Sequence, residues 1–234
     1  MDDKFQRLKL LIGEENFSKL NAATVAIFGV GGVGSFAVEA LARSGVGHLV
    51  LIDKDNIDAT NINRQIHALT STVGKSKVEV MRERILDINP AAQVDTIQKF
   101  FLPTEVVDDF FICRYDYVVD AIDTLTAKIF LVEECVRRGI KIISSMGAGN
   151  KLDPTRFKVS DIFQTTTDPV AKIMRKQLKL RGIKNLKVVW SDEAPKKQLG
   201  IRNEELGIIS SVAFVPSVAG LILAGEVVKD LLNE

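Results

Sequence analysis

The stretch TVAIFGVGGVGSFAVEALARSGVGHLVLIDKD, residues 24–55, decides the fold class. It begins with an apolar, β-rich run, passes through a glycine-rich turn into a helical pattern that stops at Ser44–Gly45, and ends with a second apolar run. The turn holds three glycines in the G-x-G-x-x-G spacing, Gly29, Gly31 and Gly34. Asp53 follows at about the separation expected for a ribose-binding carboxylate. This order predicts a nucleotide-binding unit, favoured over glycines that serve close packing alone, but it does not distinguish NAD, FAD, S-adenosylmethionine or ATP.

The composition predicts one globular enzyme domain over residues 1–234. The chain is 46% hydrophobic and 26% charged with a formal net charge of +1, so it has material for a core and no global charge that selects a partner. Cys113 and Cys135 are too far apart for a Cys-x-x-Cys metal site, and we expect both to be buried structural thiols. The start MDDKFQRLKL is too charged for a secretory signal, and Pro216 and Glu226 interrupt the last apolar run. We therefore expect a cytoplasmic protein without a membrane span.

The alternation of apolar runs and helical patterns predicts an α/β fold with a doubly wound, mainly parallel, Rossmann-like sheet. Residues 1–20 are expected to form one or two short helices, residues 21–150 the nucleotide-binding core, and residues 151–234 a C-terminal extension of the same domain. In the core we expect strands at 24–28, 48–53, 93–100, 115–123 and 141–148, and helices at 35–43, 75–88, 105–112 and 125–139. In the extension we expect a hairpin around Asp153–Pro154, a basic helical stretch over 168–187, an irregular segment over 188–208, and then a strand followed by a helix.

The stretch DATNINRQIHAL, residues 58–69, concentrates hydrogen-bonding side chains just after the second expected strand. Asn61, Arg64 and Gln65 have the spacing i, i+3 and i+4, so they share one face if the stretch is helical. An arginine presents a rigid fork of donors to phosphate oxygens, and Lys77 follows near the start of the next helix. We expect His67 to support this loop by hydrogen bonds.

Asp120 and Asp123 lie at the carboxyl end of the fourth expected strand, where open α/β sheets bind ligands. A carboxylate opposite Arg64 and Lys77 suits a magnesium triphosphate, with the acid on the metal and the cations on the phosphates. Taken alone, each residue has a plainer alternative: a surface ion pair for Arg64, a solvated helix face for Lys77, and a helix N-cap for either aspartate. Their joint placement favours ATP.

Several segments resemble the E1-like activating-enzyme superfamily, the fold of ubiquitin-activating enzymes and bacterial sulfur-carrier adenylyltransferases. The segments are GVGGVGS, the Asp53–Asp55 pair, TNINRQIHAL, VGKSKVEVM, ILDINP and VVDAIDT. Within the superfamily, NRQIHA, SMGAGNKLDPT and VSDIFQTTTDP are most similar to the tRNA threonylcarbamoyladenosine dehydratases. The resemblance covers nearly the whole chain, and its motifs are more specific than the glycine turn alone.

The resemblance implies roles for individual residues. ATP would be bound by glycines and polar residues, namely Gly29, Gly31, Gly32, Gly34, Asp53, Asp55, Gln65 and Asp120, with Asp53 on the ribose. Asn61, Arg64 and Lys77 would contact the polyphosphate and polarise the α-phosphorus. Asp123 would take Mg²⁺ or the reacting carboxylate.

The resemblance also implies a substrate and partners. The carboxylate of threonylcarbamoyladenosine, at position 37 of tRNA, would attack the α-phosphate and form an acyl-adenylate, after which an internal nucleophile closes a ring and expels AMP. The family further implies a homodimer in which an N-terminal arginine, Arg7 being the candidate, reaches the partner's site. A sulfur-transfer protein is a further possible partner. The ring form of the product, the tRNA species and monovalent ion binding stay open.

A basic tract over residues 172–197 carries nine cationic residues against Asp192 and Glu193. The cationic residues are Lys172, Arg175, Lys176, Lys179, Arg181, Lys184, Lys187, Lys196 and Lys197. Such a local excess suits contacts with RNA phosphates, the alternative being a solvated helix face. Trp190 could stack a base, but packing in the core is favoured for it.

Three other functions stay open at this point. A sulfur-carrier adenylyltransferase is the nearest, although no cysteine follows Cys135, which disfavours thioester transfer and paired Cys-x-x-Cys zinc ligands. A tRNA-binding protein on a degenerate nucleotide fold need not keep Arg64, Lys77 and Asp123. An NAD-dependent dehydrogenase leaves Arg64 and Lys77 unexplained.

Overall fold

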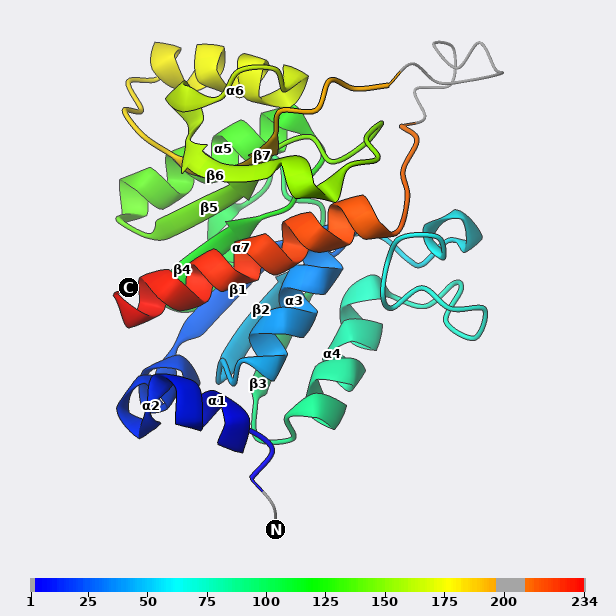
Figure 1. Cartoon of the computed structure of the whole chain (residues 1–234), viewed down its shortest axis with the longest axis vertical. Helices are drawn as coiled ribbons and strands as arrows, with labels where there is room; N and C mark the ends of the chain where they lie inside the picture. Colours follow the sequence, from blue (N-terminus) through cyan, green and yellow to red (C-terminus); the bar gives the residue numbers. More distant parts are fainter. Residues whose placement is uncertain (1–2, 197–208, 234) are drawn as a thin grey trace.

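The computed structural model describes residues 3–196 and 209–233, and within them the chain forms one seven-stranded sheet (Figure 1). The strands are β1 (Thr24–Phe28), β2 (His48–Ile52), β3 (Gln93–Ile97), β4 (Tyr117–Asp120), β5 (Lys141–Ser145), β6 (Phe157–Asp161) and β7 (Lys187–Ser191). Their order is β3-β2-β1-β4-β5-β7-β6. All neighbours pair in parallel except β6 and β7. The predicted doubly wound, mainly parallel sheet is confirmed.

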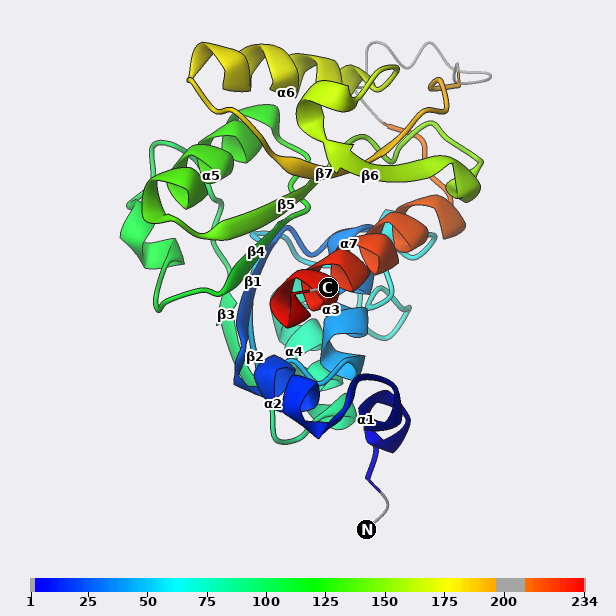
Figure 2. The ribbon, with the colours of Figure 1, turned by 60° about the vertical axis from the view of Figure 1, so that its left-hand side comes forward.

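Helices cover both faces of the sheet (Figures 1 and 2). The helices are α1 (Gln6–Ile12), α2 (Glu14–Ala22), α3 (Gly34–Arg43), α4 (Lys77–Ile88), α5 (Leu125–Arg138), α6 (Pro169–Leu180) and α7 (Phe214–Leu232). Short 3₁₀ turns occupy Ala59–Asn61, Val107–Phe110, Pro154–Arg156 and Ile162–Gln164. Helices α3, α4 and α7 lie on one face, and α5 and α6 lie on the other.

Strand β1 shows why the sheet is covered on both sides. Its side chains alternate, so Val25 and Ile27 join the core beneath α3, α4 and α7, whereas Ala26 and Phe28 join the core beneath α5. All four side chains are fully buried. A central parallel strand therefore needs a continuous apolar run, which is what the sequence has here.

The C-terminal extension completes this same sheet. Strands β7 and β6 continue it beyond β5, and α7 crosses α3 at Gly220. A Cβ at Gly220 would lie 2.2 Å from the carbonyl oxygen of Val33, so only glycine allows this approach of the two helices. The shared sheet is thus the reason to treat residues 151–234 as an extension of one domain.

Several predictions for the extension were wrong. There is no strand before the Asp153–Pro154 turn: Asp153 caps a 3₁₀ turn, and β6 pairs with β7 far along the chain, because an antiparallel partner need not be adjacent in sequence. The basic helix ends at Leu180, and residues 187–191, expected to be helical and irregular, form β7. Residues 209–213 are not a strand, and α7 starts at Phe214. Residues 197–208 of the expected irregular segment lie outside the described residues.

The last apolar run of the sequence forms most of helix α7. None of the helices within residues 3–196 and 209–233 is long and apolar enough to cross a membrane.

Candidate nucleotide-binding site

A cavity of about 400 Å³ opens at the carboxyl ends of β1, β2, β4 and β5. The strand order changes direction between β1 and β4, so the cavity lies at the topological switch point where such sheets bind ligands. Ten of the predicted residues line it: Gly29, Gly31, Gly32, Asp53, Asp55, Asn61, Arg64, Gln65, Lys77 and Asp123. Two others, Gly34 and Asp120, do not lie on its wall.

The glycines of the turn serve two different purposes. Gly29 has φ +89°, and a Cβ there would lie 2.6 Å from the carbonyl oxygen of Ala121. A Cβ at Gly34 would lie 1.8 Å from the carbonyl oxygen of Gly29, so Gly34 serves the tight packing of the turn. Gly31 and Gly32 meet only side-chain atoms, at 3.3 Å or more, on the cavity side. The glycines available to approach a bound phosphate are therefore those in the middle of the turn.

Asp53 links the turn to the loop after β2. Its Oδ2 accepts a hydrogen bond from the Val30 amide at 2.7 Å, and its Oδ1 accepts one from the Asp55 amide at 2.9 Å. Burial raises the pKa of Asp53 and outweighs the opposing effect of Lys77. The ammonium of Lys77, itself buried, lies 2.9 Å from Asp55 Oδ2 and 4.0 Å from Asp53 Oδ1. One wall of the cavity thus holds two carboxylates and a cation within reach of one another.

The loop over residues 58–69 brings its predicted residues together without an α-helix. Asp58 caps a 3₁₀ turn, and Asn61 Oδ1 accepts from the Asp58 amide at 3.1 Å, which fixes the Asn61 side chain. The amides of Arg64 and Gln65 both donate to the carbonyl of Asn61, so the chain winds tightly and all three side chains reach the cavity. The Arg64 guanidinium donates from Nη1 to the carbonyl of Thr60 at 2.8 Å, which orients the fork.

His67 does not support the loop in the predicted way. It is 2% exposed, and neither ring nitrogen has a hydrogen-bond partner among the described residues. Burial, together with the charges of Lys77 and Arg84, lowers the pKa of His67 to about 4. The ring is a neutral packing element beneath the loop.

Asp120 is fully buried beneath the cavity and accepts hydrogen bonds from Ser144 and from the amide of Ile122. Its Oδ2 also lies 2.9 Å from Lys128 Nζ. These contacts engage both carboxylate oxygens, and Asp120 is not among the residues that line the cavity, so the acid supports the wall from below. Asp123 is exposed on the wall, and within residues 3–196 and 209–233 its Oδ1 accepts a hydrogen bond from Thr124 Oγ1 alone.

Several residues that line the nucleotide cavity were not predicted from the sequence. Lys128 lines the cavity from α5 although its neighbours Ala127 and Leu131 are core residues; a lysine on the apolar face of a helix was the signal available. The segment Lys99–Phe101 after β3 adds an apolar side, and residues 145–149 after β5 add another. Residues 145–149 begin the segment SMGAGNKLDPT, which carries part of the family resemblance, but no role at the cavity was predicted for them or for Lys99–Phe101.

Magnesium fits this site as a partner of phosphate, not as an ion held in a protein cage. Within the described residues there is no cluster of three or more His, Cys, Asp or Glu side chains that would hold a metal ion. Asp123 offers a single exposed carboxylate on the wall. Mg²⁺ at nucleotide sites commonly takes one or two carboxylates, phosphate oxygens and water, which matches this donor set.

The basic tract separates into exposed and structurally engaged residues. Four lysines are exposed on and just after α6, with no ion pair among the described residues: Lys172, Lys176, Lys179 and Lys184. Arg175 donates to Thr165, and Arg181 pairs with Glu133. Lys187 binds Asp230 and Glu226 of α7, so it does not share the exposed surface. Lys196 is exposed, and Lys197 lies outside the described residues.

The packing expected for Trp190 is confirmed. Its side chain is 5% exposed, and its indole nitrogen donates to Ser160 Oγ at 2.9 Å. Cys135 is buried as predicted, but Cys113 is exposed, because it lies in a surface loop before β4.

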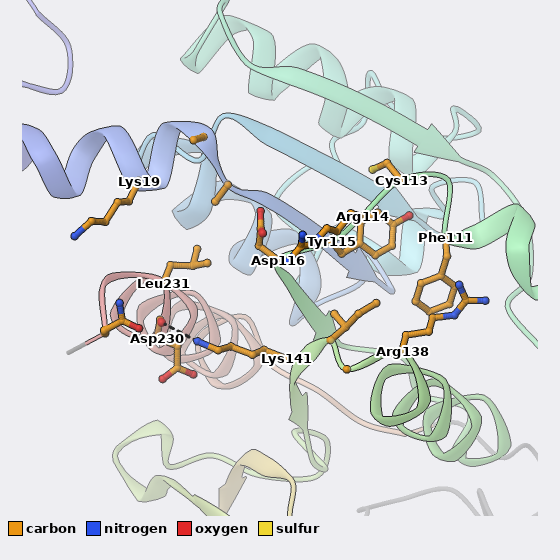
Figure 3. Close-up of a pocket in the computed structure, with 15 residues that line it drawn as sticks. Lys19, Phe111, Cys113, Arg114, Tyr115, Asp116, Arg138, Lys141, Asp230 and Leu231 are labelled. Carbon is orange, nitrogen blue, oxygen red and sulfur yellow. Dashed lines mark hydrogen bonds between the residues drawn. The ribbon is translucent and has the colours of Figure 1, made fainter.

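A second cavity, of about 890 Å³, lies at the opposite end of the sheet, before the amino ends of β1, β4 and β5 and where α2, α5 and α7 end (Figure 3). Its carboxylates are engaged: Asp116 accepts from the Thr24 amide, and Asp230 accepts from Tyr117 and Lys187. Lys141 donates to the Asp230 carbonyl, as expected for a cation at a helix C-terminus. None of the predicted nucleotide-binding residues lines it.

The ThiF family profile matches residues 5–234. The chain belongs to the ThiF family. It is 52% identical to the tRNA threonylcarbamoyladenosine dehydratase of Bacillus subtilis (strain 168), over 99% of this chain and 95% of that protein. The crystal structure of the Escherichia coli tRNA N6-threonylcarbamoyladenosine dehydratase in complex with AMP superimposes with a TM-score of 0.91 at 35% identity, covering 98% of this chain and 94% of that one. The same enzyme in complex with ATP gives 0.90 with the same coverage. The family relationship expected from the sequence is confirmed, and so is the fold.

Proposed function

We propose that this chain is an ATP-dependent tRNA threonylcarbamoyladenosine dehydratase. The observation that carries the proposal is the full-length 52% identity to a dehydratase, together with Arg64, Lys77 and Asp123 lining one cavity. The solved relatives that bind ATP and AMP have the same fold over nearly the whole chain. An NAD-dependent dehydrogenase gives these three residues no role.

The reaction consists of two displacements. The threonylcarbamoyl carboxylate of tRNA attacks the α-phosphorus of ATP, a new oxygen–phosphorus bond forms, and pyrophosphate leaves. A nucleophile within the same threonylcarbamoyl group then attacks the activated carbonyl, the ring closes, AMP leaves with the former carboxylate oxygen, and the proton of the nucleophile is released. Relative to the carboxylic acid, the nucleoside has lost one oxygen and two hydrogens. The net change in the nucleoside is the loss of one water, driven by conversion of ATP to AMP and pyrophosphate.

The first step needs positive charge around crowded phosphates. Arg64 supplies a fork of donors whose orientation is fixed by Thr60, and Lys77 supplies a buried ammonium. The Asn61 amide has its carbonyl engaged by the Asp58 amide, which leaves its nitrogen to donate into the cavity. The proposed ribose ligand is Asp53, which lines the cavity and accepts a hydrogen bond from the Val30 amide of the glycine turn.

Asp123 is the proposed magnesium ligand. When bound, magnesium would neutralise phosphate charge and support the departure of pyrophosphate. The exposed carboxylate on the wall is the contribution of this chain to that ion.

The four exposed lysines on and after α6 are the proposed contact with tRNA. Val170 of α6 lines the cavity, so the helix that carries Lys172, Lys176 and Lys179 begins at the site itself. An RNA bound along this surface would hold its modified nucleoside close to the α-phosphate. We expect the enzyme to act in the cytoplasm, where its tRNA substrate is found.

The N-terminal helices support a homodimer. Helix α1 buries no residue, and Leu10 and Leu11 are 80% and 82% exposed, an apolar surface suited to a second copy. Arg7 is exposed on α1. Figure 1 shows α1 beside α2, which leads into the start of β1, whereas the cavity is lined by residues that follow the carboxyl ends of the strands. Any contact of Arg7 with a nucleotide site is therefore with the site of a partner.

The decisive experiment is turnover with defined substrates. The purified protein is incubated with ATP, magnesium and tRNA that carries threonylcarbamoyladenosine, and AMP and the mass of the nucleoside are measured. We expect AMP in equal amount to a nucleoside lighter by one water, and neither product with tRNA that lacks the modification. AMP formation that requires a small carrier protein with a Gly-Gly tail would contradict the proposal in favour of an adenylyltransferase.

A further inference from the structure

Lys128 places a buried ammonium beside the nucleotide cavity. The residue belongs to α5, its side chain is 2% exposed, and it lines the cavity. Its Nζ lies 2.9 Å from Asp120 Oδ2 and donates to the carbonyl oxygen of Ile122 at 3.1 Å. Asp120 is fully buried, so this pair of charges is enclosed by protein.

The partners of Lys128 are the last residue of β4, Asp120, and Ile122 in the turn between β4 and α5. Asp120 Oδ1 accepts from the Ile122 amide at 3.1 Å, while Lys128 holds the Ile122 carbonyl. The two polar backbone groups of Ile122 are therefore fixed from below, and Ser144 ties Asp120 to β5. The peptide unit that follows Ile122 leads directly into Asp123, so this network sets the direction in which the chain presents Asp123.

Asp123 has little else to hold it. Its side chain is exposed, and among the described residues it accepts a hydrogen bond only from the adjacent Thr124, at 3.2 Å. The position of its carboxylate thus depends on the backbone of the turn. The same turn packs against Gly29, where a Cβ would meet the Ala121 carbonyl at 2.6 Å and the Ile122 nitrogen at 3.0 Å. A shift of the turn would displace the carboxylate relative to the glycines that approach the phosphates.

Stability alone does not call for a lysine here. Burying two charges has a desolvation cost, and an apolar pair of similar volume often gives equal or greater stability. The neighbours of Lys128 on α5, Ala127 and Leu131, are core residues. A lysine differs from them in that it binds a carboxylate and a backbone carbonyl at once.

We propose that Lys128 is a positioning residue, which holds the Asp123 carboxylate in the place where it binds the magnesium of MgATP. The inference rests on the proposed function, because that function makes Asp123 the magnesium ligand. Lys128 acts through the turn, and its loss is felt as a loss of magnesium-dependent nucleotide binding.

The test compares ATP affinity with and without magnesium by calorimetry, in the absence of tRNA. Lys128→Met leaves the buried Asp120 charge without its cation, so it is combined with Asp120→Asn, which keeps an acceptor for the Ile122 amide and removes the charge. Lys128→Arg keeps the positive charge. Asp123→Asn defines the effect of losing the carboxylate itself, and circular dichroism checks that each variant is folded.

We expect the affinity of the double variant for ATP without magnesium to lie within about threefold of the wild-type value. The increase in ATP affinity on adding magnesium should be about tenfold smaller than in wild type, an effect typical of groups that support a metal ligand. Lys128→Arg should recover part of that gain. Adding Asp123→Asn to the double variant should cause no further loss, because both changes remove the same interaction. A wild-type magnesium gain in the folded double variant, or losses that add when Asp123→Asn is included, would overturn the inference.

A matched control lies at the other end of β4. Tyr117 donates to Asp230 Oδ2 at 2.6 Å, so Tyr117→Phe breaks a partly buried contact of the same strand far from the cavity. It should lower the unfolding temperature and leave the magnesium gain at its wild-type value. An equal loss of the gain in Tyr117→Phe would show that general destabilisation is the cause and would overturn the inference.

The same measurements separate this inference from the proposed function. If wild type gains ATP affinity with magnesium through Asp123 but does not dehydrate the tRNA, the proposed substrate is wrong and the role of Lys128 stands. If Asp123→Asn keeps the wild-type magnesium gain, the inference fails even where the tRNA is dehydrated.

Discussion

The ammonium of Lys77 lies 2.9 Å from Asp55 Oδ2, so the cation proposed for the phosphates of ATP already has a carboxylate partner in the chain. Lys77 is 7% exposed at its side chain, whereas Asp55 is 49% exposed and able to turn towards solvent. Binding of a triphosphate would exchange this partner for a phosphate oxygen. The pair gives the buried ammonium of Lys77 a partner and fixes its position before the nucleotide arrives.

Asp55→Asn should therefore strengthen the binding of ATP. Removing a half-exposed partner is worth about 1 kcal/mol or less, or about fivefold in affinity. Calorimetry with adenosine serves as the control, because adenosine has no phosphate for Lys77 to contact. An equal change for ATP and adenosine would place the effect of Asp55 on the nucleoside and contradict the exchange.

Arg64→Ala should abolish formation of AMP while leaving the fold intact. The side chain is partly exposed and donates hydrogen bonds to Thr60 and Asn63 of its own loop, so the free energy of unfolding should change by less than about 1 kcal/mol. Loss of a charged donor to developing phosphate charge should lower the rate by about a hundredfold or more. Arg82→Ala, on the outer side of α4 where Arg82 pairs with Glu79, is the matched control and should retain full turnover. If Arg64→Ala retained turnover, Arg64 would not be needed for the formation of AMP, and its assigned role would be contradicted.

Lys179→Ala combined with Lys184→Ala should weaken tRNA binding and flatten its dependence on salt. Each lost phosphate contact lowers the slope of log affinity against log salt by about one, so the double variant should lose about two. ATP affinity should stay unchanged, because neither lysine lines the cavity. Lys19→Ala, on α2 at the opposite end of the strands from the nucleotide cavity, is the control and should leave tRNA binding unchanged. A salt slope equal to that of wild type would place the tRNA elsewhere.

His67 should make the folded state less stable in acid. Its pKa is about 4 in the folded chain against 6.5 for an ordinary histidine, so between these values the unfolded chain binds a proton that the folded chain does not. Stability is therefore lost as the pH falls from 6.5 towards 4, by about 2 kcal/mol at pH 5. Urea unfolding of wild type and His67→Gln at pH 7 and pH 5 measures this contribution. The variant should show the smaller difference between the two pH values; an equal difference would mean that His67 is protonated in the fold.

Leu10→Glu combined with Leu11→Glu should convert a homodimer into monomers. Both side chains are about four-fifths exposed on a helix that buries none of its residues, so the change should not disturb the fold of one chain. Light scattering coupled to size-exclusion chromatography gives the mass directly, with Lys9→Ala on the same helix as the control. A wild-type mass of one chain would contradict the dimer, and an unchanged dimer in the double variant would locate its interface elsewhere.

The core of the fold could be predicted because its signals are local. A buried parallel strand such as β1 needs a continuous apolar run, and the turn at Gly29 needs a glycine for its positive φ. Helix α5 was predicted nearly to its last residue because the left-handed Gly139 ends it. Strand β7 was not predicted, and β6 was expected only as half of a local hairpin, because each is stabilised by a partner distant in sequence and carries little pattern of its own.

The same distinction holds for the site. The sequence by itself determined that the chain has a nucleotide-binding turn and cations for phosphate, since Arg64, Lys77 and the glycine turn occur at recognisable spacing. Only the tertiary structure decided which of two nearby carboxylates faces the cavity: Asp120 is buried under Lys128 and Ser144, whereas Asp123 reaches the wall. A spacing along the chain records the order of groups, but the orientation of each group at the end of a strand depends on side chains from other elements that fill the space beneath it.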